Sequence, residues 1–194
     1  MATNICIFAS GNGSNAEAII AYFSSDPDIQ VELIISSSPD AYVLERAKSH
    51  KIPSIVLGKV PFKESTLLLD ELQKHRIDLI VLAGFMWLVP SYLVEAYPDK
   101  ILNIHPALLP KYGGKGMYGS HVHEAVIAAK EPESGITIHF VNEKYDDGAI
   151  ITQEKCTVSE SDTPDSLAEK IHQLEHQHFP RVISEVINRR PLKN

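Results

Sequence analysis

The chain has 194 residues, and its 18 Lys+Arg against 25 Asp+Glu give a net charge of −7. The hydrophobic share of 44% is enough for a sizeable core and excludes a disordered tail protein. The acidic balance argues against a general nucleic-acid or membrane-surface binder. Neither a basic, apolar secretory signal nor a membrane-spanning run is found, so the sequence predicts a soluble, cytoplasmic protein.

Apolar runs alternate with helix-length amphipathic stretches, which is typical of parallel βαβ units. In chain order, strands are predicted at residues 4–9, 30–36, 54–57, 77–83 and 100–104, with helices between them at 15–24, 41–50, 62–76 and 91–97. The strand at 77–83 is nearly all apolar, which suits burial on both faces of a sheet.

The second half of the chain changes character. Residues 135–141 alternate in polarity, as does the run that ends near Val158, and this predicts a hairpin-like strand pair added to the sheet. A final helix starts near Thr163 and Pro164 and runs towards Asn188, with Pro180 expected to bend it. The sequence therefore predicts a single α/β domain over 1–194, a Rossmann-like, mostly parallel twisted sheet flanked by helices.

The loop between the first strand and the first helix is the first candidate site. Residues 10–15 read SGNGSN, and two glycines allow a tight turn whose following helix N-terminus binds anions, most often phosphate. With Ala16 the run also fits the dinucleotide pattern G-x-G-x-x-A. That pattern needs an acidic residue after the second strand, where this chain has Ser36. A capped turn without a ligand is the third interpretation.

Asn103 and His105 end the fifth strand, and residues two apart in a strand share a face. Pro106 stops the ladder there, and ligands of open α/β sheets bind at the carboxyl ends of strands. An amide beside an imidazole is suited to stabilise an oxyanion and to move a proton. The alternative is a strand end with a hydrogen-bonded core histidine.

Asp146 lies in a turn between two strand-like runs, where aspartate and glycine are ordinary turn residues. It becomes catalytic only if the fold brings it to His105. The nine histidines include His121 with His123 and His172 with His176, but no ligand motif accompanies them, so no metal site is predicted.

Two further segments are informative. Four of the ten glycines fall within 113–119, which indicates a mobile loop over a site or a flexible surface excursion. Residues 82–89 (LAGFMWLV) leave a buried strand and either line an apolar slot for a flat ring or pack in the core.

Taken together, these segments resemble the folate-dependent formyltransferases, and the GNGSN loop narrows the likeness to their glycinamide ribonucleotide branch. The likeness rests on residues 11–15, 82–86, 103–110 (NIHPALLP), 135–137 and the D-x-G of Asp146 and Gly148, and it reaches to Leu174–His176 and Phe179–Pro180. Methionyl-tRNA formyltransferase and formyltetrahydrofolate deformylase would each need a further domain.

The resemblance implies an enzyme of purine biosynthesis that transfers the formyl group of 10-formyltetrahydrofolate to the amine of 5'-phosphoribosylglycinamide without a metal. It implies a phosphate-binding half over 1–100 and a catalytic and folate-binding half over 101–194. The implied catalytic residues are Asn103, His105 and Asp146. Gly13, Ser14 and Asn15 bind the substrate phosphate, Glu175 contacts the glycinamide part, and the folate is bound by Met86, Trp87, Leu88, Val89, Asn103 and Lys63.

Three departures from the family pattern stand out. The loop after Pro110 is longer and richer in glycine, Trp87 stands where the family often has arginine, and Lys63 is the candidate for a folate-tail arginine. Asp146 is expected to favour a protonated His105 that stabilises the oxyanion with Asn103. The competing interpretations are a nicotinamide-dependent oxidoreductase and a non-catalytic nucleotide-phosphate binding module. The protein is expected to be a monomer or a homodimer.

Overall fold

A computed structural model describes residues 2–64 and 66–189. In this described part, seven strands form one sheet in the order β3-β2-β1-β4-β5-β6-β7. The strands are β1 (Thr3–Ala9), β2 (Ile29–Ser36), β3 (Ser54–Val56), β4 (Leu79–Leu82), β5 (Ile101–His105), β6 (Glu133–Phe140) and β7 (Ile150–Thr157). The helices are α1 (Ser14–Phe23), α2 (Val43–Ser49), α3 (Lys59–Glu64), α4 (Thr66–Lys74), α5 (Ser91–Ala96), α6 (Ser120–Ala128) and α7 (Pro164–Arg189).

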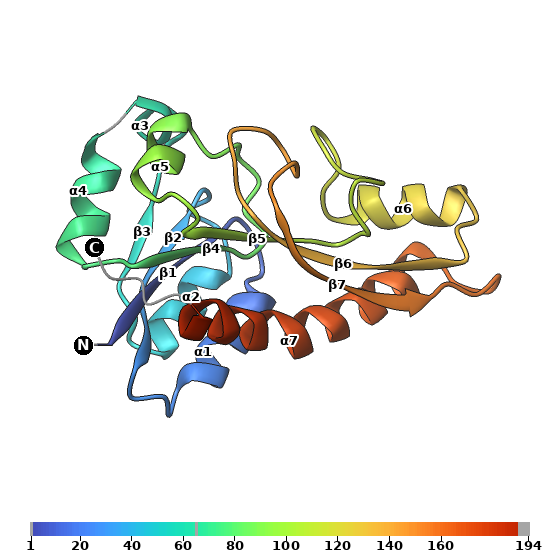
Figure 1. Cartoon of the computed structure of the whole chain (residues 1–194), viewed down its shortest axis with the longest axis horizontal. Coiled ribbons are helices and arrows are strands. Elements are labelled where there is room, and N and C mark those ends of the chain that lie inside the picture. The colour runs from blue at the N-terminus through green and yellow to red at the C-terminus, as the bar shows by residue number, and fades with distance from the viewer. Residues whose placement is uncertain (1, 65, 190–194) are drawn as a thin grey trace.

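Helices cover both faces of the sheet, as the apolar strands predict. On β1, Ile5 and Ile7 pack into the core cluster with α1, α2 and α7, whereas Cys6 and Phe8 pack into a second cluster with α3, α4 and α5. Figure 1 shows α1 and α7 on one side of the sheet and α3 and α5 on the other. Because successive side chains of a strand point to opposite faces, a strand between two helical layers is apolar at every position.

The strand order creates a crevice beside β1. Strands β1 to β5 are parallel, and the chain moves from β1 to β2 and β3 on one side before returning to β4 on the other. Loops from neighbouring strands diverge at such a switch point, and ligands bind there, outside the carboxyl ends. The two loops concerned begin at Ser10 and Ala83, and the backbone N–H of Ser10 donates to the carbonyl of Gly84 at 3.0 Å.

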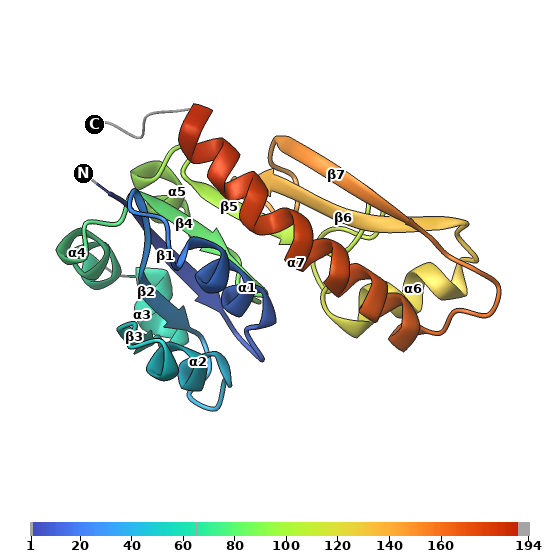
Figure 2. The ribbon, with the colours of Figure 1, turned by 90° about the horizontal axis from the view of Figure 1, so that it is seen from below.

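The predicted strand pair is present. β6 runs antiparallel to β5 and β7 antiparallel to β6, in a register that places Asn103 opposite His139 and His105 opposite Thr137. Helix α7 continues through Pro180 and lies along the sheet, as Figure 2 shows from below. The single α/β domain with a mostly parallel sheet and a long terminal helix is thus confirmed.

Two local predictions differ from the structure. Helices α3 and α4 stand where one helix over 62–76 was expected, and α6 occupies a segment for which no element was expected. α6 buries Val122, His123 and Val126, so a histidine fills one position of its inward face. A histidine at a buried position interrupts the helical spacing of apolar residues on which sequence prediction depends. No helix among the described residues is long and apolar enough to cross a bilayer.

Candidate active site

The loop after β1 is shaped by its second glycine. Gly13 has a φ of 74° and precedes α1, whose N-terminus carries no side-chain cap. A Cβ at Gly13 would lie 2.5 Å from Cγ2 of Val43 on α2, so glycine is required by contact as well as by conformation. The uncapped amides of the first turn of α1 are therefore presented to the crevice, where they suit an anion.

Arg46 on α2, which sequence reasoning missed, holds this loop through hydrogen bonds to Asn12. Its Nε donates to the carbonyl of Asn12 at 2.9 Å, and Nη2 donates to Oδ1 of the same residue at 2.9 Å. A third contact joins Nη1 to Glu17 at 3.1 Å, and the guanidinium lies over the ring of Tyr42. Arginine and glutamate are common on neighbouring helices, so the sequence alone could not reveal that Arg46 holds the loop.

Asn15 and Glu175 meet across the crevice. Asn15 Nδ2 donates to Oε2 of Glu175 at 2.9 Å, although the residues lie on α1 and α7. Glu175 is only 6% exposed, and burial raises the pKa of its carboxyl group, against the opposing effects of Asn15 and His172. A hydrogen bond therefore joins Asn15 of the predicted phosphate loop to Glu175, the predicted glycinamide contact.

The three predicted catalytic residues lie together. Nδ1 of His105 is 3.6 Å from Oδ2 of Asp146, and Nδ2 of Asn103 is 3.5 Å from Oδ1 of the same carboxylate. Asp146 adopts a φ of 53°, a conformation that aspartate and asparagine tolerate better than most residues. The turn that bears Asp146 connects β6 to β7, so the strand pair added to the parallel sheet brings it to the end of β5.

His139, which is buried, is a fourth polar residue in this group, and sequence reasoning missed it. Its Nδ1 donates to the carbonyl of Phe140 at 2.8 Å, which leaves Nε2 to accept from Nδ2 of Asn103 at 3.0 Å. Burial lowers the pKa of His139, so the ring is neutral near pH 7. The signal that could have found it is its place opposite Asn103 in the β5–β6 register, which requires the strand pairing.

His105 differs from expectation in its charge. Burial lowers the pKa of this imidazole, and this outweighs the opposing effects of Asp146 and of the Tyr112 carbonyl. Nε2 lies 2.7 Å from that carbonyl, which can only accept, so Nε2 carries the proton. The sequence-based expectation included the effect of the Asp146 carboxylate on the pKa of His105 but not the effect of burying the ring. The resting ring is therefore neutral, with the Nδ1 lone pair on the side of Asp146.

Two neighbouring cavities meet at Asn103 and Asp146. The larger, of about 510 Å³, is lined by the loop 11–15, by His105 and Glu175, and by the glycine-rich residues 114–119. The smaller, of about 60 Å³, is lined by Trp87, Leu88 and Val89. Phe85, Asn103, Tyr145 and Asp146 line both. Cavities of several hundred cubic ångströms are typical of small-molecule sites.

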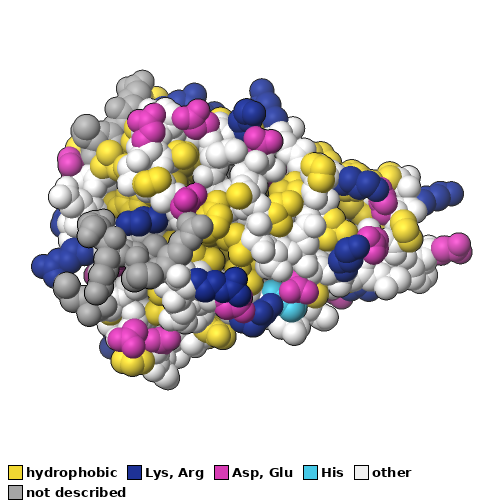
Figure 3. Space-filling model, viewed as in Figure 1, with side chains coloured by type: hydrophobic (Ala, Val, Ile, Leu, Met, Phe, Trp, Pro, Cys, Tyr) yellow, Lys and Arg dark blue, Asp and Glu magenta, His cyan; other side chains and the backbone are white. Residues whose placement is uncertain are grey.

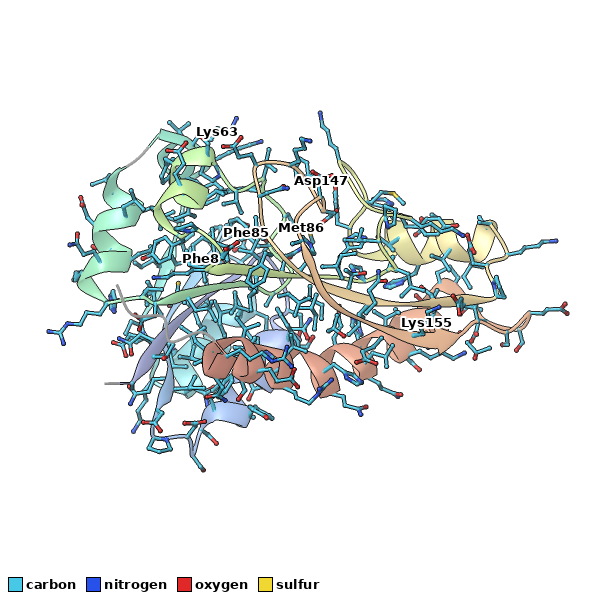
Figure 4. The ribbon with its side chains drawn as sticks, in the orientation of Figure 1. Phe8, Lys63, Phe85, Met86, Asp147 and Lys155 are labelled. Carbon is cyan, nitrogen blue, oxygen red and sulfur yellow. The ribbon has the colours of Figure 1, made fainter. Side chains whose placement is uncertain are left out.

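The predicted folate segment divides between the cavities. Met86 lines the larger one and donates its backbone N–H to Ser10 Oγ at 3.1 Å. The Trp87 ring packs 5.4 Å from Phe62 and 5.8 Å from Phe85, centroid to centroid, so it belongs to an aromatic cluster at the wall of the smaller cavity. Lys63 is exposed on α3, and it is not among the described residues that line either cavity. In Figure 4 it lies well apart from Met86.

The described residues were compared with the requirements of a metal centre, and one face of the molecule (Figure 3) with those of a basic surface. Within the described ranges there is no group of three or more His, Cys, Asp or Glu that could hold a metal ion. His121 pairs with Glu124 on the exposed side of α6, while His123 turns inward to the larger cavity. On the face drawn in Figure 3, basic and acidic side chains are interspersed.

Comparison with known proteins identifies relatives along nearly the whole chain. A family model described as formyl transferase matches residues 3–183. A Bacillus subtilis phosphoribosylglycinamide formyltransferase is 38% identical over 188 residues, 93% of each protein. A chloroplastic phosphoribosylglycinamide formyltransferase of Arabidopsis thaliana is 40% identical over 96% of this chain, which spans 66% of that relative's length. The crystal structure of the Bacillus halodurans phosphoribosylglycinamide formyltransferase superposes with a TM-score of 0.87 at 38% identity, covering 95% of both chains.

Proposed function

The chain belongs to the formyl transferase family, and we propose that it transfers the formyl group of 10-formyltetrahydrofolate to the amine of 5'-phosphoribosylglycinamide, a step of purine biosynthesis. Relatives that bear the name phosphoribosylglycinamide formyltransferase match 93% and 95% of this chain. The dinucleotide interpretation loses its basis, since β2 ends in Ser36 rather than in an acidic residue.

The observation that carries this proposal is the position of Asn103 and Asp146 in the wall of both cavities. Direct transfer between two bound molecules requires that they meet at the reacting groups. The ribonucleotide occupies the larger cavity, with its phosphate at Gly13, Ser14 and Asn15 and its glycinamide part at Glu175. Residues on both sides of position 100 line each cavity, so the phosphate-binding and catalytic halves build both sites jointly.

The folate binds where the two cavities meet, against Met86 of the larger cavity and Trp87, Leu88 and Val89 of the smaller one, beside Asn103. The pterin is a flat ring, and Phe85 and Trp87, which pack on the buried ring of Phe62, supply an apolar wall of matching shape. Lys63 follows Phe62 on α3 and is exposed, so it is the proposed contact for the anionic folate tail where that tail leaves the protein.

The chemistry follows from the neutral state of His105. The substrate amine attacks the formyl carbon, a new C–N bond forms, and the carbonyl oxygen becomes an oxyanion. His105 accepts the amine proton at Nδ1, and the carboxylate of Asp146 stabilises the resulting imidazolium. Asn103 keeps one N–H on His139, and its other N–H, which makes a long contact of 3.5 Å with Asp146, turns to the oxyanion as that charge forms. Such a donor typically contributes about 2.7–4 kcal/mol. The intermediate collapses as N10 of the folate leaves with the proton from His105.

One assay tests this function. The protein is mixed with 10-formyltetrahydrofolate and 5'-phosphoribosylglycinamide, and the absorbance of the folate product is followed. We expect turnover only when both substrates are present, and loss of turnover in an Asp146→Asn variant. Release of formate without the ribonucleotide, or reduction of a nicotinamide cofactor, would contradict the proposal.

A cytoplasmic location and a monomeric or homodimeric state complete the proposal. Cell fractionation tests the first, which two plant relatives named as chloroplastic make worth measuring. Sedimentation velocity tests the second.

A further inference from the structure

The segment 111–114, after the fifth strand, touches both members of the proton-transfer pair. The carbonyl of Tyr112 accepts from Nε2 of His105 at 2.7 Å, and the backbone N–H of Gly114 donates to Oδ2 of Asp146 at 2.9 Å. Gly113 lies between these contacts, and a Cβ there would lie 2.5 Å from Cδ2 of Leu109 and 3.3 Å from Cβ of Asp146. The relative position of imidazole and carboxylate thus depends on one short piece of backbone.

The contact with Tyr112 decides which nitrogen of His105 does the chemistry. A carbonyl oxygen accepts hydrogen bonds only, so it keeps the proton of a neutral ring on Nε2. Nδ1 is then the base, and it faces the carboxylate of Asp146. If the carbonyl turned away, the proton could occupy Nδ1. The lone pair would then be on Nε2, and Nδ1 could no longer act as the base.

Tyr112 holds this carbonyl in place from an unfavourable backbone conformation. Its φ is 56°, in the left-handed region, which costs free energy for a residue that bears a side chain. Thr137 fastens the chain just before it, since its Oγ1 accepts from the backbone N–H of Leu109 at 3.0 Å and donates to the carbonyl of Ala107 at 2.7 Å. Tyr112 itself needs a further anchor.

That anchor is the carboxylate of Glu131, which follows α6. The Tyr112 hydroxyl donates to Oε1 of Glu131 at 2.9 Å, and Nζ of Lys111 donates to Oε1 at 2.8 Å and to Oε2 at 3.1 Å. The backbone N–H of Glu131 donates to the carbonyl of Val126, which ties the group to α6. These bonds keep the pKa of Glu131 below its usual value, so the anchor is charged near pH 7.

We propose that Glu131 is a positioning residue for the reaction, which holds Tyr112 so that its carbonyl fixes the His105 tautomer with Nδ1 as the base. The proposal rests on the proposed function of His105. The titratable groups that face His105 are Asp146 and the neutral rings of His123 and His139. Asp146 is therefore the charged group nearest this ring, and the Tyr112 carbonyl orients the ring relative to it.

Two variants test the proposal without touching the reacting groups. Glu131→Gln weakens both bonds to the anchor, and Tyr112→Phe removes only the hydroxyl. We expect kcat to fall about tenfold to a hundredfold in each, because small misplacements of catalytic groups have effects of this size. KM for both substrates should change by less than about twofold, since neither residue contacts a ligand. The double variant should lose little more than the worse single variant, because both act on one contact.

Nitrogen NMR of the imidazoles gives a readout that does not depend on turnover. In the wild-type protein above its pKa, the His105 ring should show a protonated Nε2 and an unprotonated Nδ1, with the signals assigned from a His105→Gln variant. In Glu131→Gln and Tyr112→Phe the two tautomers should mix. The acid limb of kcat/KM should move to lower pH, because the Tyr112 carbonyl raises the pKa of His105.

A matched control is available in the two strands β6 and β7. Glu133 on β6 pairs with Lys155 on β7 at 2.7 Å, and neither residue lines a cavity among the described residues. Figure 4 labels Lys155, which lies away from the loop of Asp147. Glu133→Gln should leave kcat and the nitrogen spectrum unchanged.

Normal kcat in folded Glu131→Gln and Tyr112→Phe would overturn the proposal, and so would reduced kcat with an unchanged tautomer. A wild-type protein that binds both substrates but transfers no formyl group would instead contradict the proposed function. In that case the nitrogen spectra would still show whether Glu131 sets the tautomer.

Discussion

At the proposed phosphate end of the larger cavity the wall comes from consecutive residues 11–15, whereas at the proposed catalytic end it comes from the end of β5, the turn at Asp146 and the glycine-rich residues 114–119. The first presents backbone amides on a short loop braced by Arg46. The second presents side chains whose charge states depend on burial and on one another.

The difference has a physical consequence. A backbone anion site needs only the right φ angles and a helix N-terminus, and it changes little with pH. A proton-transfer site needs groups held within tenths of an ångström at matched pKa values, so it is sensitive to distant supports. Changes at the catalytic end should therefore act on kcat, and changes at the phosphate end on binding.

The largest effect is expected for Asp146→Asn. Asparagine tolerates the φ of 53° and preserves size, so the fold should be kept while the charge that stabilises the imidazolium is lost. We expect kcat to fall about 10²–10⁴-fold with KM values nearly unchanged. His105→Ala should be as damaging, and the double variant should cost far less than the sum.

The pH profile sharpens the same prediction. Because Asp146 raises the pKa of His105, the acid limb of kcat/KM should move to lower pH in Asp146→Asn. Steady-state kinetics from pH 5 to 9 measure both effects. Near-normal kcat with an unshifted limb would make Asp146 a turn residue only.

A smaller effect, on binding and stability, is expected for Gly13→Ala. Its Cβ would meet Val43 at 2.5 Å, and the φ of 74° is unfavourable for alanine. We expect a stability loss of about 1–3 kcal/mol. KM for the ribonucleotide should rise more than about tenfold, with the folate KM unchanged. Gly11→Ala is the control for stability alone, since a Cβ there meets no protein atom within 4 Å. Equal losses for both substrates would contradict the phosphate assignment.

The two ends should also differ in how pH affects stability. Burial lowers the pKa values of His105, His123 and His139 below the usual 6.5, so the unfolded chain binds more protons as pH falls through 6.5. Stability should therefore decrease from pH 7.5 to 5.5, by at most about 1.4 kcal/mol per pH unit for each ring.

Glu175 has the opposite effect on the pH dependence of stability. Burial raises the pKa of its carboxyl group, so the folded protein takes up a proton at a higher pH than the unfolded chain does. Glu175→Gln should therefore steepen the decrease. Urea unfolding at several pH values measures both slopes. A flat curve in Glu175→Gln, where this opposing effect is removed, would mean that these imidazoles are not desolvated in solution.

The smallest effect is expected for Trp87→Ala, at the edge of the catalytic region. The ring packs against Phe62 and Phe85 and forms only one wall of the smaller cavity. We expect the folate KM to rise about threefold to tenfold, in line with the loss of one aromatic contact. The KM for the ribonucleotide and kcat should stay within about twofold. Unchanged folate kinetics would indicate that only the backbone of this segment matters.

The sequence by itself determined the features that depend on near neighbours. The period of apolar residues predicted the parallel sheet and the added strand pair, and the glycines of the first loop predicted an anion site. Residues two apart on β5 placed Asn103 and His105 on one face. Each of these follows from backbone geometry within a few residues, which the local sequence largely fixes.

Only the tertiary structure decided how distant residues meet and how deeply they are buried. The β5–β6 register set His139 against Asn103, the turn after β6 delivered Asp146, and α7 brought Glu175 to Asn15. The neutral state of His105 depends on desolvation by the whole fold, which no local pattern records. Distances and dielectric surroundings arise from packing between elements far apart in the chain, and for that reason they appear only once the sheet is assembled.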